Sequence, residues 1–141
     1  MQNKNLIAYI KEQFKTGGMI KKLILLNAAV FLFYLILQVM SKLFLIDSDI
    51  TDGIYYTLFV LPGSFAQLLY KPWTLVTNLF GHGDFSHFAF NMLIFFLTAR
   101  IFVSLFGEKR LLSTYLLGGI FGALVHMVSY LIFPVFNNVD A

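Results

Sequence analysis

The 141-residue sequence contains no cysteine, only three prolines and few charged residues. Without cysteine the chain has no disulfide, no thiolate metal ligand and no cysteine nucleophile. Charged residues make up 12% of the chain, whereas 59% of the residues are hydrophobic. This charged share is about half that of an ordinary soluble domain, which is too small to cover a soluble surface, and the hydrophobic content excludes a disordered chain. We therefore expect an integral membrane protein.

The basic residues do not form a nucleic-acid binding pattern. The formal net charge is only +3, and the cations do not line a groove. Because the rest of the chain favours lipid, we exclude nucleic acid as a partner and expect the lipid bilayer instead.

Three apolar segments are long enough to cross a bilayer, whose hydrocarbon core of about 30 Å requires about 20 helical residues. They are residues 23–45, 87–106 and 111–133. The first is too long for a signal-peptide core and is not followed by a small-residue cleavage site, so we expect it to be retained. The fold class is therefore expected to be all-α, a polytopic membrane helix bundle formed by residues 23–141.

Residues 1–22 precede the first apolar segment. Within them Leu6, Ile10 and Phe14 recur every four residues with lysines between them. This spacing suggests a short helix on the cytoplasmic membrane surface, and a solvated tail with chance periodicity is the alternative.

The distribution of charge predicts the orientation. Lys21 and Lys22 precede the first span, and Arg100, Lys109 and Arg110 cluster where the second span gives way to the third. Since Lys and Arg are enriched on the cytoplasmic side, we expect the N-terminus in the cytoplasm and the C-terminus outside.

The segment 46–86, between the first two spans, is unusually long and apolar for an external connection. Aromatic residues are abundant in it, and Pro62-Gly63 and Lys71-Pro72 interrupt it. Aromatic side chains prefer the headgroup level, so we expect this outer loop to be embedded in the outer leaflet and to pack beside the bundle.

Polar residues at the start of the second span are the main candidates for chemistry. His87 and Asn91 are four residues apart and share one helix face. Two donors one turn apart can bind a single anionic oxygen, as in the tetrahedral intermediate of acyl transfer. Ordinary interhelical hydrogen bonds and a zinc site formed by His82, Asp84 and His87 are the alternatives from the residues alone.

A second pair, His126 and Ser129, lies on the third span. Two side chains on one rigid helix rarely reach nucleophile–base geometry, and no acidic residue lies nearby to orient the imidazole. We interpret this pair as a helix-packing feature.

Several short motifs from residue 71 onwards together resemble the rhomboid family of intramembrane serine proteases. They are Lys71-Pro72-Trp73-Thr74, His82, His87-Phe88-Ala89-Phe90-Asn91-Met92-Leu93, Arg100-Ile101-Phe102, Lys109-Arg110-Leu111 and Tyr115-Leu116-Leu117-Gly118-Gly119. The resemblance implies that the three spans are the first three transmembrane helices of a six-helix core. It also implies that His87 and Asn91 stabilise the oxyanion and that His82 lies in the active-site vicinity.

The same resemblance implies an activity. The family's nucleophile is a serine in a Gly-x-Ser-Gly motif on helix four, paired with a histidine on helix six, and neither occurs in this sequence. We expect the N-terminal half of a serine endopeptidase that cleaves transmembrane segments of other membrane proteins, here an inactive fragment truncated before the catalytic serine. The alternative is a catalytically inactive rhomboid-like protein that binds transmembrane helices. No cofactor or metal is implied, and a bacterial inner membrane is the expected location.

The sequence departs from the family pattern at two places. Trp73-Thr74 stands where the family often has Trp-Arg, and Ala99 and Val103 stand where it has Gly-x-x-x-Glu. If the Arg and Glu pair in relatives, the loss of both leaves no buried charge without its partner.

Overall fold

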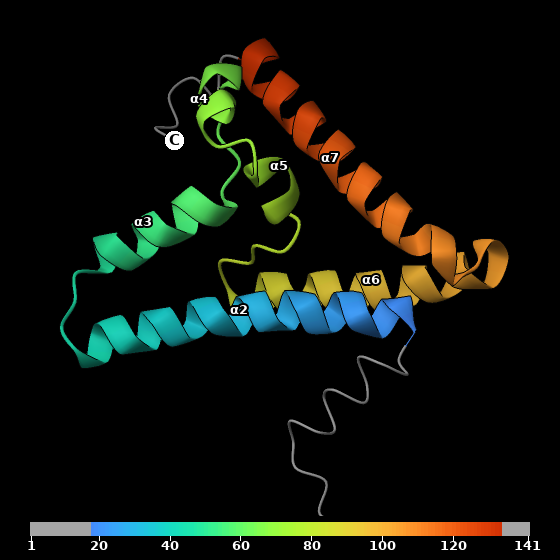
Figure 1. Cartoon of the computed structure of the whole chain (residues 1–141), viewed down its shortest axis with the longest axis horizontal. Helices are drawn as coiled ribbons and strands as arrows, with labels where there is room; N and C mark the ends of the chain where they lie inside the picture. Colours follow the sequence, from blue (N-terminus) through green and yellow to red (C-terminus); the bar gives the residue numbers. More distant parts are fainter. Residues whose placement is uncertain (1–17, 134–141) are drawn as a thin grey trace, which may run out of the picture.

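The structure, a computed structural model, describes residues 18–133, which form six helices (Figure 1). They are α2 (Met19–Leu43), α3 (Ser48–Phe59), α4 (Phe65–Tyr70), α5 (Thr74–Thr77), α6 (Phe85–Phe106) and α7 (Glu108–Ile132). Helices α2, α6 and α7 are each long and apolar enough to cross a membrane. The expected all-α polytopic membrane bundle is confirmed. The N-terminal repeat of Leu6, Ile10 and Phe14 lies outside the described residues.

The three long helices form an open wedge. Helices α2 and α6 run side by side, and α7 turns back from the end of α6 and diverges from it (Figure 1). The short helix α5 contacts both α7 and α3, so it lies in the space that the diverging helices enclose. The outer segment is therefore packed into the bundle.

The closed end of the wedge holds a hydrophobic cluster. Leu23 of α2, Ala99 of α6 and Leu111 of α7 are each no more than 4% exposed and are packed with Phe102 and other apolar side chains. One residue, Gly107, joins α6 to α7 with a φ of 81°, which a residue with a Cβ rarely adopts. The cluster and this tight link fix where α6 and α7 meet.

All three long helices begin earlier than the apolar runs alone indicated, α2 at Met19 instead of residue 23. Helix α6 begins at Phe85 because the Asp84 carboxylate accepts a hydrogen bond from the His87 backbone N–H at 2.8 Å, which caps the helix. Helix α7 begins at Glu108, directly after Gly107. The start of α6 is therefore a local cap effect.

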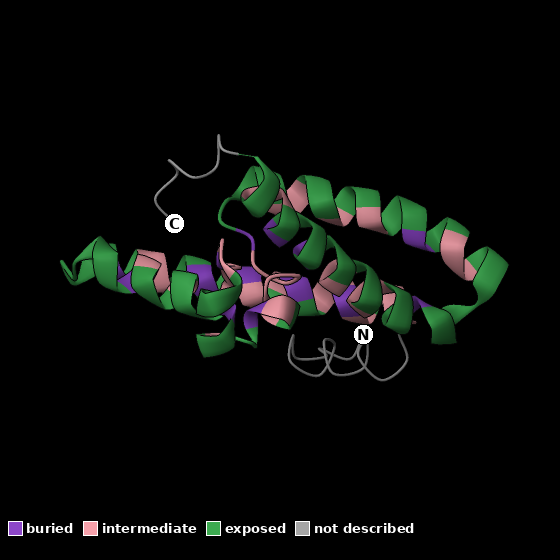
Figure 2. Ribbon diagram, turned by 90° about the horizontal axis from the view of Figure 1, so that it is seen from above, coloured by how far each residue is buried: buried purple, intermediate pink, exposed green. Residues whose placement is uncertain are grey.

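Most apolar residues of α6 and α7 are exposed (Figure 2, green). Phe90, Leu97 and Ile101 of α6 are 66%, 53% and 64% exposed, and Phe121 of α7 is 69% exposed. Such surfaces are costly in water but suit lipid.

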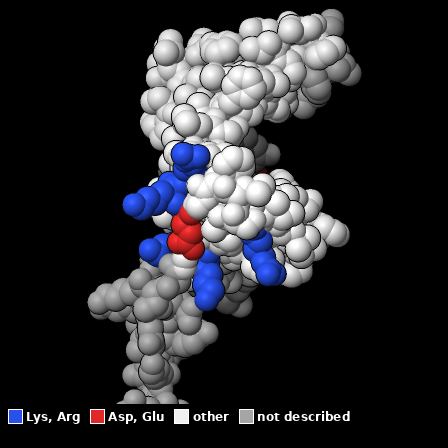
Figure 3. Space-filling view, turned by 90° about the vertical axis from the view of Figure 1, so that its right-hand side faces the viewer, with Lys and Arg blue, Asp and Glu red and all other residues white. Residues whose placement is uncertain are grey.

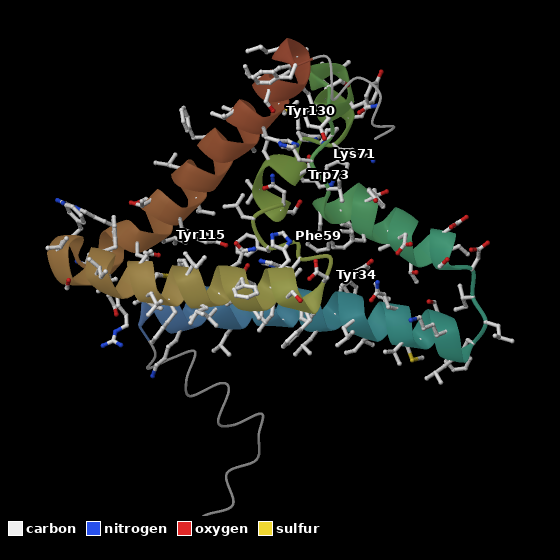
Figure 4. The ribbon with its side chains drawn as sticks, turned by 180° about the vertical axis from the view of Figure 1, so that it is seen from behind. Tyr34, Phe59, Lys71, Trp73, Tyr115 and Tyr130 are labelled. Atoms are coloured by element: carbon white, nitrogen blue, oxygen red, sulfur yellow. The ribbon has the colours of Figure 1, made fainter. Side chains whose placement is uncertain are left out.

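Polar and aromatic contacts attach the outer segment to the bundle. The Tyr34 hydroxyl of α2 donates to Asp52 of α3 at 3.2 Å, and its ring stacks on Tyr55 at 4.2 Å (Figure 4). The indole N–H of Trp73 donates to the backbone oxygen of Thr57 at 3.0 Å, which ties the segment before α5 to α3. The depth of the segment in the outer leaflet stays a prediction.

Basic residues gather at the closed end of the wedge, where α2 begins and α6 turns into α7 (Figure 3). Lys21 and Lys22 lie in the first turn of α2, and Lys109 and Arg110 lie in the first turn of α7. Charges that are separated in the sequence therefore lie at one end of the described structure.

Candidate functional site

His87 and Asn91 line the same cavity, which has a volume of about 400 Å³. Both side chains come from α6, one turn apart, and His82 reaches the cavity from the loop before α6. The opposite wall comes from α7 and from the end of α5, and comprises Asn78, Leu79, Tyr115, Gly118 and Gly119. The structure thus brings together the three candidates from the sequence, while their catalytic roles stay predictions.

A hydrogen bond within α6 fixes the side chain of Asn91. One Asn91 side-chain N–H donates to the backbone oxygen of His87 at 2.9 Å. A carboxamide has two N–H donors, so one remains for a group in the cavity. Asp84 fixes the backbone of the same turn through the His87 N–H.

His82 is the buried member of the group, at 5% exposed. Its Nδ1 lies 3.1 Å from the backbone oxygen of Phe80, so we assign the proton to Nδ1 and leave Nε2 as an acceptor. The ring lies edge-on to His87 and to Phe88, each with a centroid distance of 5.4 Å. Burial lowers the pKa of His82 below its ordinary value of 6.5, with a smaller contribution from His87 in the same direction.

A polar network that the sequence reasoning missed supports one wall of the cavity. The Tyr115 hydroxyl donates to the backbone oxygen of Leu79 at 3.0 Å and accepts from the Asn27 side-chain N–H at 3.3 Å. Asn27 is fully buried and also donates to the backbone oxygen of Leu23 at 2.8 Å. The network joins α2, α7 and the loop before His82, and Tyr115 lies near the closed end in Figure 4. The sequence signal for this network was the polar residue Asn27 within an apolar span.

Glycines allow the loop before His82 to approach its neighbours. A Cβ on Gly119 would collide with the side chain of Leu79, whereas a Cβ on Gly118 would meet nothing within 4 Å. A Cβ on Gly81 would lie 2.8 Å from that of Phe59. The loop is therefore packed tightly between α3 and α7.

The structure gives no support to the other candidate sites. Ser129 donates its hydroxyl to the backbone oxygen of His126 at 2.6 Å, and the His126 ring packs on Tyr130 at 4.8 Å. Within residues 18–133 no three His, Asp or Glu side chains are grouped so that they could hold a metal ion. Asp84, considered as a zinc ligand, instead caps α6.

The positions that depart from the family pattern are filled without strain. Thr74 is fully buried and donates its hydroxyl to the backbone oxygen of Lys71 at 2.7 Å. Ala99 is 3% exposed in the core of the closed end. Across the described part of the chain, every buried side-chain nitrogen and oxygen has a hydrogen-bond partner.

Comparison with known proteins finds a match between part of the chain and one family model. Residues 69–133 match the family model described as Rhomboid domain. The match runs from the end of α4 to the end of α7 and includes every residue of the candidate site. No curated protein and no solved structure was found to match the chain.

Proposed function

Given that this chain is a rhomboid family membrane protein, we propose that its cavity is the oxyanion-binding part of an intramembrane serine endopeptidase. The substrates are transmembrane segments of other membrane proteins. The reaction also needs a serine nucleophile and a partner histidine, and no Gly-x-Ser-Gly motif occurs in these 141 residues. The observation that best supports this proposal is that His87 and Asn91 line one cavity.

The proposed reaction assigns a separate role to each group. The serine hydroxyl attacks the peptide carbonyl while the histidine accepts its proton, and the carbonyl oxygen becomes an oxyanion. The His87 ring and the free N–H of Asn91 donate hydrogen bonds to that oxygen. The intermediate then expels the amine, which takes the proton from the histidine, and water releases the acyl group by the same steps.

In this proposal His82 positions the His87 ring and takes no part in the reaction itself. Its Nδ1 is bonded to the Phe80 backbone oxygen, and its edge-on contact with His87 limits the directions in which the His87 ring can turn. Because burial lowers the pKa of His82, its neutral ring adds no positive charge beside the oxyanion donors.

The deciding experiment uses the protein encoded by the complete reading frame that contains this sequence. The protein is reconstituted in vesicles with a transmembrane reporter substrate, and kcat and KM are measured. Loss of one oxyanion donor typically lowers kcat about 10²- to 10³-fold, and we expect this loss for Asn91→Ala with KM little changed.

Thr98→Ala is the matched control. Thr98 lies two turns further along α6 and, like Asn91, donates to a backbone oxygen one turn earlier, at 2.8 Å, but it does not line the cavity. We expect wild-type turnover for this variant. Wild-type turnover for Asn91→Ala would refute the oxyanion role.

The second candidate is a rhomboid-like protein that binds transmembrane helices without cutting them. The sequence favours it only in that no Gly-x-Ser-Gly motif occurs in these 141 residues. A completed protein that is not labelled by a fluorophosphonate probe, but co-purifies with an uncut reporter helix, would support this candidate over the protease.

The orientation proposed with this function has the closed end of the wedge in the cytoplasm, as in a bacterial inner membrane. It is supported by the basic residues gathered there (Figure 3). Because the chain has no cysteine, single cysteines can be labelled without background. A cysteine at Lys109 should react with an impermeant maleimide only after the cytoplasmic side is opened, and one at Asp49 should react in intact cells.

A further inference from the structure

A second polar cavity lies away from the candidate site, between the end of α2 and the start of α3. Its volume is about 470 Å³, within the range of small-ligand sites. The charged side chains that line it are Lys42, at the end of α2, and Asp52, in α3. The function proposed above uses neither residue.

The cavity presents one charge of each sign. Lys42 is an exposed cation in the last turn of α2. Asp52 is half-buried, and one of its oxygens accepts the Tyr34 hydroxyl at 3.2 Å, which leaves the other oxygen for a ligand donor. Two hydroxyls of the cavity donate to backbone oxygens, Ser41 at 3.0 Å and Thr51 at 2.8 Å.

An anion alone does not suit this cavity. Asp47 caps the start of α3 by accepting the Asp49 backbone N–H at 3.1 Å, so this helix N-terminus already has its negative partner. Among the residues that line the cavity, the Asp52 carboxylate balances Lys42, the one cation. A ligand with both a phosphate and an ammonium group would pair with Lys42 and Asp52 at once.

The rim of the cavity is apolar and faces outward. Leu45 and Ile46 line it and are 93% and 45% exposed, and the adjacent Leu43 and Phe44 are 70% and 66% exposed. These side chains continue the apolar surface of a helix that is long enough to cross a membrane. Charged and apolar side chains together at the end of such a helix match the boundary between headgroups and acyl chains.

From this combination we propose that the cavity between α2 and α3 binds the headgroup of a zwitterionic, amine-bearing phospholipid such as phosphatidylethanolamine. The phosphate pairs with Lys42 and the ammonium with Asp52, while the acyl chains lie against Leu43 and Phe44. The bound lipid would brace the attachment of α3 to α2.

The test uses the full 141-residue chain in bilayer nanodiscs that contain phosphatidylethanolamine and phosphatidylglycerol in equal amounts. Native mass spectrometry after release counts the lipids retained on the protein. We expect phosphatidylethanolamine to be retained in preference, and Lys42→Gln and Asp52→Asn each to reduce its retention about fivefold, as for loss of one charge-assisted contact.

Matched variants control for charge alone. Asp49→Asn removes a carboxylate from α3 outside the cavity, and Lys109→Gln removes a cation from the opposite end of the wedge. Both should retain phosphatidylethanolamine as the wild type does. Should Asp52→Asn lose helical circular dichroism, Lys42→Gln decides alone, because its side chain is exposed.

Three results would overturn the proposal. The first is equal retention of the two lipids, and the second is wild-type retention of phosphatidylethanolamine in the folded cavity variants. The third is displacement of the lipid by soluble glycerophosphoethanolamine at equal concentration, which would show that the headgroup is recognised without its acyl chains.

Discussion

Replacing Gly119 with alanine tests the packing between α7 and the loop that carries His82. A Cβ at this position collides with the side chain of Leu79, including a contact of 2.9 Å to Cδ1. Leu79 lines the cavity, and its backbone oxygen accepts from Tyr115. The side chain must therefore move into the cavity or push the loop away from α7.

The magnitude follows from two opposing effects. Glycine to alanine within a helix favours folding by up to about 1 kcal/mol, whereas an extra methyl group in a packed contact costs about 1–3 kcal/mol. Gly118→Ala carries only the first effect, because nothing lies within 4 Å of its Cβ. We expect Gly119→Ala to be less stable than Gly118→Ala by about 1–3 kcal/mol.

The assay is reversible unfolding in mixed micelles with increasing dodecyl sulfate. Helical circular dichroism and the fluorescence of Trp73, the single tryptophan, report the transition. In a Leu79→Ala background the difference between Gly119→Ala and Gly118→Ala should disappear, since the colliding atoms are gone. Equal effects of the two alanines in the wild-type background would refute the packing described here.

Two further predictions concern single groups around the cavity. Tyr115→Phe removes a donor to the Leu79 backbone and an acceptor for Asn27, so we expect the free energy of unfolding to fall by about 1–2 kcal/mol in the same assay. Tyr70→Phe is the control, because its side chain is 82% exposed and the change should affect stability little. A similar loss of stability in both variants would contradict the network. His82 has a pKa below its ordinary 6.5 because of burial, so the unfolded chain binds the proton more readily and stability should be full above pH 6.5 and fall as the pH drops below it. His82→Gln should flatten this dependence, which unfolding midpoints at several pH values would measure. An unchanged slope in this variant would show that the reasoning is wrong.

The sequence predicted well the features that depend on local spacing. Runs of apolar residues revealed the three long helices because their length must match a bilayer. The four-residue spacing of His87 and Asn91 was enough to place both on one face, since a rigid helix leaves them no other arrangement. Both side chains line one cavity.

Features that depend on distant contacts were not predicted. Asn27 and Tyr115 are 88 residues apart, and spacing along the chain does not reveal which spans meet. The burial of His82 depends on the packing of its loop between α3 and α7, which arises only in the folded chain. The start of α6 was placed two residues late because the Asp84 cap, and not apolar periodicity, decides it.

Because a single residue, Gly107, joins α6 to α7, a small change at this link alters the angle between the two helices. Helix α7 has 25 residues, which corresponds to a length of about 37 Å. A rotation of roughly 5° at the Gly107 pivot would therefore carry the far tip of α7 through roughly 3 Å. Gly118 and Gly119, which line the cavity opposite Asn91 about halfway along α7, would move through roughly 1.5 Å and so change its width. Substitutions at Leu23, Ala99 or Leu111, which pack together where the helices meet, would then change the width of the cavity by altering the angle between α6 and α7.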